Sequence, residues 1–110
     1  MLADYQTAFH VRGEETLGAI RPQTCLNIIL FYKETLHNII KHADADRVET
    51  FVHVSGRDLY LDVSDNGIGH ARDGVRISQA LRKRATRMGG KATSKNNPKG
   101  GVRIRLNCPL

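Results

Sequence analysis

Two alternating apolar segments joined by a short turn constrain the fold of this chain more than any other feature. Valines alternate with mostly polar residues over 48–54, and leucine and valine alternate with polar residues over 59–64. The turn between them is Ser55-Gly56-Arg57. This pattern predicts a β-hairpin, so the sheet is at least partly antiparallel. A doubly wound dinucleotide-binding fold, which needs a parallel sheet, is therefore excluded.

Further elements are expected on both sides of this hairpin. We expect strands over residues 5–12, 91–94 and 102–108, and helices over 22–42 and 77–88, the second one ending at Gly89-Gly90. The first helix carries an apolar stripe that we expect to face the core: Leu26, Ile29, Leu30, Leu36, Ile40 and Ala43. This order predicts an α+β two-layer sandwich with a mixed, largely antiparallel sheet and the helices packed on one face.

The charge of the chain is unevenly distributed. The formal net charge is +6, yet the first 73 residues hold seven basic and eleven acidic side chains, whereas residues 74–110 hold ten basic side chains and no acidic one. Such a basic third favours an anionic partner, although a solvated surface rich in lysine and arginine explains it equally well. Binding of nucleic acid is not expected, because Tyr60 is the only aromatic residue beyond residue 51.

Length and composition define the class of protein. A chain of 110 residues predicts a single domain spanning residues 1–110. Cys25 and Cys108 form no CxxC pair, which argues against a disulfide scaffold or a zinc site. Neither a signal segment nor an apolar run of about 20 residues is present, so we expect a cytoplasmic location, including that of the soluble end of a membrane-anchored sensor.

Three polar residues share one face of the first predicted helix. Glu34, Asn38 and Lys41 are spaced at i, i+4 and i+7, and we expect this face to lie opposite the apolar stripe. An amide oxygen can coordinate Mg²⁺, a carboxylate can act as a base, and a lysine can contact phosphate. An ordinary solvated helix face gives the same pattern.

A glycine-rich segment, Asp65-Asn-Gly67-Ile-Gly69, directly follows the second strand of the hairpin. An aspartate at a strand end can accept a hydrogen bond from the amino group of a ligand, and glycines allow the backbone to approach a flat ring. The same letters also describe a plain turn.

Together these segments resemble a known family. Glu34-x-x-x-Asn38-x-x-Lys41-His42-Ala43, Asp65-Asn-Gly67-x-Gly69, Arg84-Ala85 with Met88-Gly89-Gly90, and Pro98-x-Gly100-Gly101 are similar to motifs of the ATP-binding catalytic domain of bacterial two-component sensor histidine kinases. The nearest resemblance is to the subfamily that includes nitrate/nitrite sensors. It covers about residues 5–110 and implies the fold of the GHKL-type ATPases.

The resemblance also implies roles for individual residues. Asn38 matches the magnesium-chelating asparagine, Glu34 the neighbouring acidic catalytic residue, and Asp65 the aspartate that recognises the adenine amino group. The remaining residues that it assigns to ATP binding are Lys41, His42, Gly67, Ile68, Gly69, Arg84 and Val102. The implied cofactors are ATP and Mg²⁺, and the implied activity is transfer of the γ-phosphoryl group to a histidine.

The sequence departs from the family pattern at three places. The segment after Gly69 is short, the second glycine motif before the Arg84 helix is not intact, and Val102 stands where a threonine is usual. The chain also contains no dimerisation and phosphoacceptor helices, so we expect either a fragment of a histidine kinase or a stand-alone domain. The expected partners are the phosphoacceptor histidine domain of the parent kinase and, indirectly, a response regulator. A degenerate domain of the same fold, acting as an interaction or regulatory module, remains the alternative.

Overall fold

The computed structural model describes residues 6–12, 20–42, 46–67, 79–98 and 100–109. Its elements follow each other in this order: β1 (Gln6–Arg12), α2 (Pro22–His42), β2 (Arg47–Ser55), β3 (Asp58–Asp65), α3 (Gln79–Arg87), β4 (Lys91–Asn96) and β5 (Val102–Pro109). The five strands form one sheet in the order β1-β2-β3-β5-β4. Only the β1–β2 pair is parallel, whereas the other three pairs are antiparallel.

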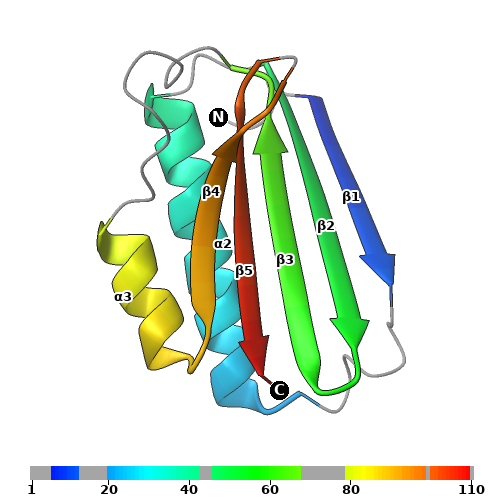
Figure 1. Cartoon of the computed structure of the whole chain (residues 1–110), viewed down its shortest axis with the longest axis vertical. Helices are drawn as coiled ribbons and strands as arrows, with labels where there is room; N and C mark the ends of the chain where they lie inside the picture. Colours follow the sequence, from blue (N-terminus) through cyan, green and yellow to red (C-terminus); the bar gives the residue numbers. More distant parts are fainter. Residues whose placement is uncertain (1–5, 13–19, 43–45, 68–78, 99, 110) are drawn as a thin grey trace.

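The two helices lie on one face of this sheet (Figure 1). This confirms the predicted α+β sandwich with its mixed, largely antiparallel sheet. The predicted hairpin is present: Ser55 pairs with Asp58 across a two-residue turn, where Gly56 adopts a φ of 62° that glycine reaches without strain. Of the second predicted helix, residues 77 and 78 lie outside the described residues.

Alternation along β3 and β5 builds the core between sheet and helices. Leu59, Leu61 and Val63 of β3 are buried, as are the residues at every second position of β5 from Val102 to Cys108. Leu81 and Ala85 of α3 cover them from the helix side. The core is therefore made mainly by the three central strands and one line of residues on each helix.

The apolar stripe predicted for the first helix was wrong at Leu26 and Ile29, whereas Leu36 does pack against the core. The core residues of α2 are Phe31 and Ile39, aligned with the buried Thr35 at i, i+4 and i+8, whereas Leu26 and Ile29 are 49% and 54% exposed. Apolar residues surround most of this helix, so their spacing alone fits more than one face. Phe31 is the largest fully buried side chain of this helix. Thr35 satisfies its hydroxyl within the helix by donating to the Phe31 carbonyl at 2.9 Å. Ala43 lies outside the described residues.

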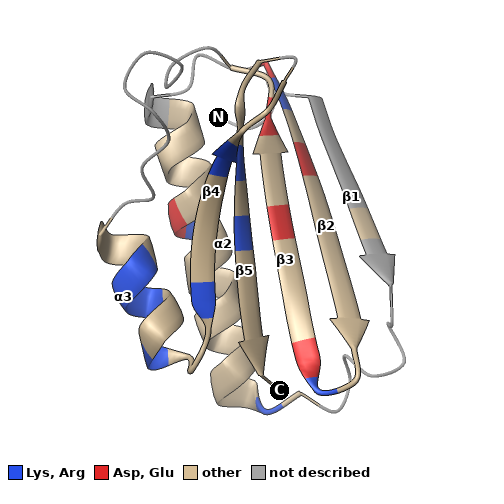
Figure 2. Cartoon of the chain, viewed as in Figure 1, with Lys and Arg blue, Asp and Glu red and all other residues tan. Residues whose placement is uncertain are grey.

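The basic and acidic residues, which are unevenly distributed along the sequence, also lie on different elements of the fold. Figure 2 shows Lys and Arg gathered on α3, β4 and β5, whereas Asp and Glu lie mainly on β2 and β3. One ion cluster joins the two sides on the sheet face away from the helices: Asp62 of β3 accepts from Arg105 Nε at 2.8 Å and lies 3.3 Å from Arg103 Nη2. Burial raises the pKa of Asp62, but these hydrogen bonds and charges outweigh it, so the pKa lies below its ordinary value.

Candidate functional site

Three segments that are distant in the sequence meet at one end of the molecule. These are the C-terminal half of α2, the C-terminal end of β3, and the turn that joins β4 to β5 (Figure 1). Asp65 ends β3, and the turn between β4 and β5 spans residues 97–101. The antiparallel direction of β3 and β5 brings the end of one strand beside the beginning of the other.

Asp65 is held firmly in this region. Its side chain is buried, with 6% of the residue exposed. Carboxylate oxygen Oδ1 accepts a hydrogen bond from the backbone N–H of Gly67 at 2.8 Å and another from that of Val102 at 3.3 Å. Two main-chain donors from different segments therefore fix the orientation of a buried carboxylate at the end of a strand.

The turn between β4 and β5 packs tightly against the end of β3. Asn97 Nδ2 donates to the main-chain carbonyl of Asp65 at 3.3 Å. At Gly101, where φ is 92°, a Cβ atom would collide with that same carbonyl group. Only glycine permits this approach of the two backbones. Gly101 of the sequence motif is thus needed to bring Val102 within reach of Asp65.

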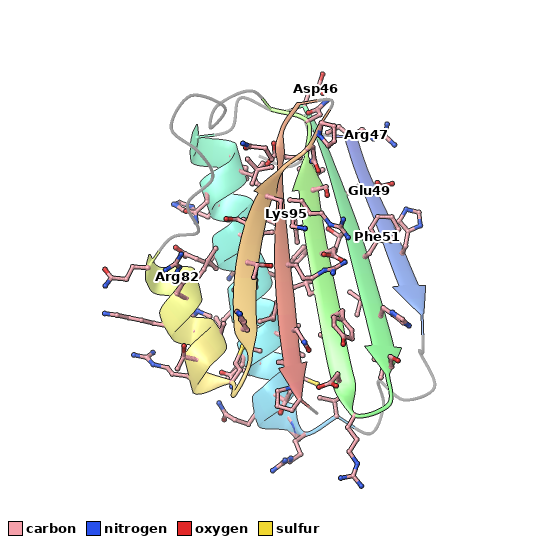
Figure 3. All side chains as sticks on the ribbon, viewed as in Figure 1. Asp46, Arg47, Glu49, Phe51, Arg82 and Lys95 are labelled. Carbon is pink, nitrogen blue, oxygen red and sulfur yellow. The ribbon has the colours of Figure 1, made fainter. Side chains whose placement is uncertain are left out.

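Asn66 is a positioning residue that the sequence reasoning missed. Its Oδ1 accepts from the backbone N–H groups of Asp46 and Arg47, at 3.1 and 3.0 Å, and its Nδ2 donates to Asp46 Oδ1 at 2.6 Å. Figure 3 labels Asp46 and Arg47 at the beginning of β2. Asn66 therefore ties the start of β2 to the segment that holds Asp65. An asparagine between an aspartate and a glycine after a strand is the signal that favours such local bonding.

Glu34 and Asn38 lie together on α2 as predicted, but not opposite its buried line. Asn38 follows Phe31 by seven residues, which places the two about 20° apart around the helix axis. Both Glu34 and Asn38 are half-buried. They flank the buried side of α2 and are thus partly shielded from water. Lys41 belongs to the last turn of this helix, as does His42, and the side chains of both lie outside the described part of the chain.

The other predicted site residues are distributed differently. Gly67 and Val102 are buried and contact Asp65 through their N–H groups. Ile68 and Gly69 lie outside the described residues. Arg84 stands on α3, and among the described residues its buried Nε has no hydrogen-bond partner. A buried cationic donor without an acceptor is costly, so Arg84 is suited to meet an anion.

Metal binding by protein side chains alone finds no support in the described part of the chain. No group of three or more His, Cys, Asp or Glu residues lies close enough there to hold a metal ion. Mg²⁺ in nucleotide sites commonly uses one or two protein oxygens together with phosphate oxygens and water. A single amide such as that of Asn38 fits this second mode.

Comparisons with known proteins bear on the sequence and the fold of the chain. No model of a protein family matches the chain. The chain is 30% identical over 91 residues to the sensor histidine kinase YxjM of Bacillus subtilis, a match that covers 81% of this chain and 22% of that protein. It therefore corresponds to about a fifth of that kinase.

Solved structures extend the similarity to the whole fold. A blue-light activated histidine kinase from Erythrobacter litoralis matches with a TM-score of 0.71 at 19% identity, over 97% of this chain and 36% of that chain. The ATP binding domain of PrrB from Mycobacterium tuberculosis matches with a TM-score of 0.61 at 27% identity, over 76% of this chain and 67% of that chain. The fold is that of the ATP-binding catalytic domains of histidine kinases. In sequence, too, this chain is similar to a sensor histidine kinase.

Neither described helix combines the length and hydropathy that crossing a membrane requires.

Proposed function

We propose that this chain is the ATP·Mg²⁺-binding catalytic domain of a two-component sensor histidine kinase, which donates the γ-phosphoryl group to a histidine on a separate domain. The observation that carries the proposal is the buried carboxylate of Asp65, fixed by the N–H groups of Gly67 and Val102. The fold similarity and the partial identity to a sensor histidine kinase agree with it. The nitrate/nitrite-sensor subfamily rests on the sequence motifs.

Asp65 would recognise the adenine base. A carboxylate that is already oriented accepts a hydrogen bond from an amino group without further loss of side-chain entropy. Gly67 would leave room for the flat ring, and the sequence resemblance implies that Ile68 and Gly69 also bind ATP. Val102 contributes its main-chain N–H, so the departure from threonine leaves the contact with Asp65 intact.

The side of α2 that carries Glu34 and Asn38 would bind the phosphate end of the nucleotide. Asn38 offers an amide oxygen to Mg²⁺, and Glu34, one turn earlier, would act as the base that accepts the proton of the acceptor histidine. Lys41 and His42 belong to the last turn, and the sequence resemblance implies that they would contact phosphate oxygens. ATP with Mg²⁺ supplies the phosphoryl group, and the protein residues position it and neutralise charge.

Arg84 supports the assignment of an anionic ligand. Its buried Nε lacks an acceptor among the described residues, and a phosphate oxygen is the acceptor that a guanidinium group binds best. The phosphate group of a nucleotide would supply this acceptor.

Phosphoryl transfer also needs an acceptor histidine, which another domain of the parent kinase would supply. The phosphoacceptor histidine domain is the direct partner, and a response regulator is the indirect one. We propose a cytoplasmic location, with any membrane attachment through the parent kinase.

Calorimetric titration of the chain with ADP, and with ATP in the presence and absence of Mg²⁺, tests nucleotide binding. Incubation with γ-labelled ATP, alone and with the phosphoacceptor domain of the parent kinase, then tests transfer. We expect nucleotide binding, labelling of the acceptor domain and no stable labelling of the chain alone, because in-line attack requires the partner helix. Strong acid-labile labelling of the chain alone would contradict the proposal.

The alternative is a degenerate domain of the same fold that acts as an interaction or regulatory module. The altered second glycine motif favours it, because that motif normally offers backbone N–H groups to phosphates at a helix N-terminus. Absence of nucleotide binding in the titration, with no labelling in either incubation, would select this alternative.

A further inference from the structure

A hollow of about 510 Å³ lies between α3 and β4, and its lining includes neither Asp65 nor Asn38. Its inner walls are small side chains: Ala85 and Thr86 from α3, and Ala92 and Ser94 from β4. Arg82 and Lys91 add positive charge to its lining. The volume falls in the usual range of binding sites, about 300–1,000 Å³. The proposed nucleotide function makes no use of this hollow.

β4 is the last strand at this side of the sheet formed by the described residues, and it pairs with β5 alone. The N–H of Asn97 bonds to the carbonyl of Gly101 at 2.9 Å, which makes this a hydrogen-bonded pair. Because such pairs alternate along an antiparallel ladder, Lys91, Thr93 and Lys95 direct their backbone groups toward β5. The backbone N–H and carbonyl of Ala92 therefore point away from β5, to the side where the hollow lies.

The charge around β4 is positive. Lys91 and Lys95 are exposed and lie on the same face of the strand, because their positions differ by an even number. Arg82 comes from α3, and Figure 3 labels it together with Lys95. Pairing of two β4 strands from two copies in antiparallel fashion, centred on Thr93, would place Lys91 opposite Lys95. Like charges in such opposite positions are destabilising, so self-association at this edge is disfavoured.

We propose that the groove between α3 and β4 binds an extended, acidic segment of a partner protein, which adds to the sheet beside β4. The segment would exchange main-chain hydrogen bonds with Ala92. Acidic side chains at alternate positions would face Lys91 and Lys95, and the intervening side chains would be small because they meet Ala85 and Thr86. This binding is independent of the nucleotide site.

An array of immobilised random peptides about seven residues long, a typical strand length, tests this proposal on the whole chain. We expect enrichment of peptides with Asp or Glu at alternate positions and small residues between them. An enriched peptide is then labelled, and its affinity is measured by fluorescence anisotropy beside a version with Lys in place of each acid. Equal binding of the two versions, or no enriched pattern, would overturn the proposal.

Variants of β4 separate main-chain pairing from simple charge attraction. Ala92→Pro removes the outward N–H without removing a hydrogen bond to β5, and should weaken peptide binding about tenfold, whereas Ala92→Ser should not. Lys91→Glu should weaken it about threefold, with Lys83→Glu on α3 as the matched control. Thermal melting checks that each variant is folded. If Ala92→Pro fails to fold, the effect of Lys91→Glu on peptide binding tests whether the peptide occupies the groove.

Two further outcomes would contradict the proposed partner. If both the Ala92→Pro variant and the Lys91→Glu variant bind the peptide as the parent does, the groove is excluded as the peptide-binding site. Sedimentation that reveals dimers abolished by Ala92→Pro, but no peptide binding, would identify a second copy of this chain as the occupant instead.

Discussion

The carboxylate of Asp65, at the end of β3, accepts a hydrogen bond at 3.3 Å from the backbone N–H of Val102, the first residue of β5. The donor belongs to the main chain, so the contact does not depend on which side chain occupies position 102. Proline is the exception, because it has no N–H group. Val102, at a position where the histidine kinases that this sequence resembles usually have threonine, therefore leaves Asp65 oriented.

Replacement of this carboxylate tests the proposed base pocket. In Asp65→Asn the amide oxygen can still accept from Gly67 and Val102, so the fold should persist. The amide NH₂ presents a donor to the amino group of adenine, and the lost charge-assisted bond is worth about 1.5–3 kcal/mol. ADP affinity should fall at least about tenfold in calorimetric titration. Unchanged affinity in a folded variant would remove Asp65 from the site.

Asn38 should matter only when the metal is present. Because its proposed role is coordination, Asn38→Ala should weaken ATP binding with Mg²⁺ and leave ADP binding without Mg²⁺ nearly unchanged. Calorimetry under both conditions compares the two effects. An equal loss under both conditions would identify Asn38 as a structural residue of α2.

Loss of the Asn66 side chain should lower stability. Asn66→Ala removes three hydrogen bonds to Asp46 and Arg47. Their exposed positions limit the cost to about 1–2 kcal/mol. The melting temperature should therefore fall by several degrees, roughly 4–8 °C per kcal/mol for a domain of this size. Asn96→Ala, at an exposed position of β4, is the matched control. An identical melting temperature for both variants would argue against a stabilising role of the hydrogen bonds between Asn66 and the start of β2.

Because of Asp62, the free energy of unfolding of the domain should depend on pH in the acidic range. Its pKa in the folded state lies below the ordinary 3.8, so its contribution is fully present above about pH 3.8 and is lost as the pH falls through the lower folded value. Asp62→Asn should cost about 1 kcal/mol in urea unfolding at pH 7, because Arg103 and Arg105 are partly exposed. The difference from the parent should shrink below about pH 3.8. A difference that stays constant with pH would show that the ion cluster contributes nothing, and Asp58→Asn on the same strand is the control.

Segments with one regular period were predictable from the sequence. The hairpin of β2 and β3, and β5 with its alternation from Val102 to Cys108, have a single apolar face each, so the period decides which residues are buried. The helix α2 differs because apolar side chains surround it. Which of Leu26 and Phe31 enters the core is decided by the shape of the sheet surface, and periodicity does not contain that information.

The sequence indicated which residue types belong to the candidate site. It did not indicate the hydrogen bonds that join them. Asp65 and Asn38 could be named because their motifs are specific. The bonds from Asn66 to the start of β2, and from Val102 to Asp65, join residues distant in the chain. Such contacts depend on strand order, because β5 rather than β4 lies beside β3. No local pattern of the sequence encodes that order.

The parallel pairing of β1 with β2 has a consequence for how the molecule forms and opens. The β2–β3 hairpin closes through a two-residue turn, whereas β1 reaches β2 only after the chain has passed through the whole of α2. The entropy of closing this long loop must be offset by one strand pairing at the margin of the sheet. We therefore expect the amide protons of β1 to exchange with deuterium well before those of β3 and β5, with opening of β1 as the lowest-energy partial unfolding step.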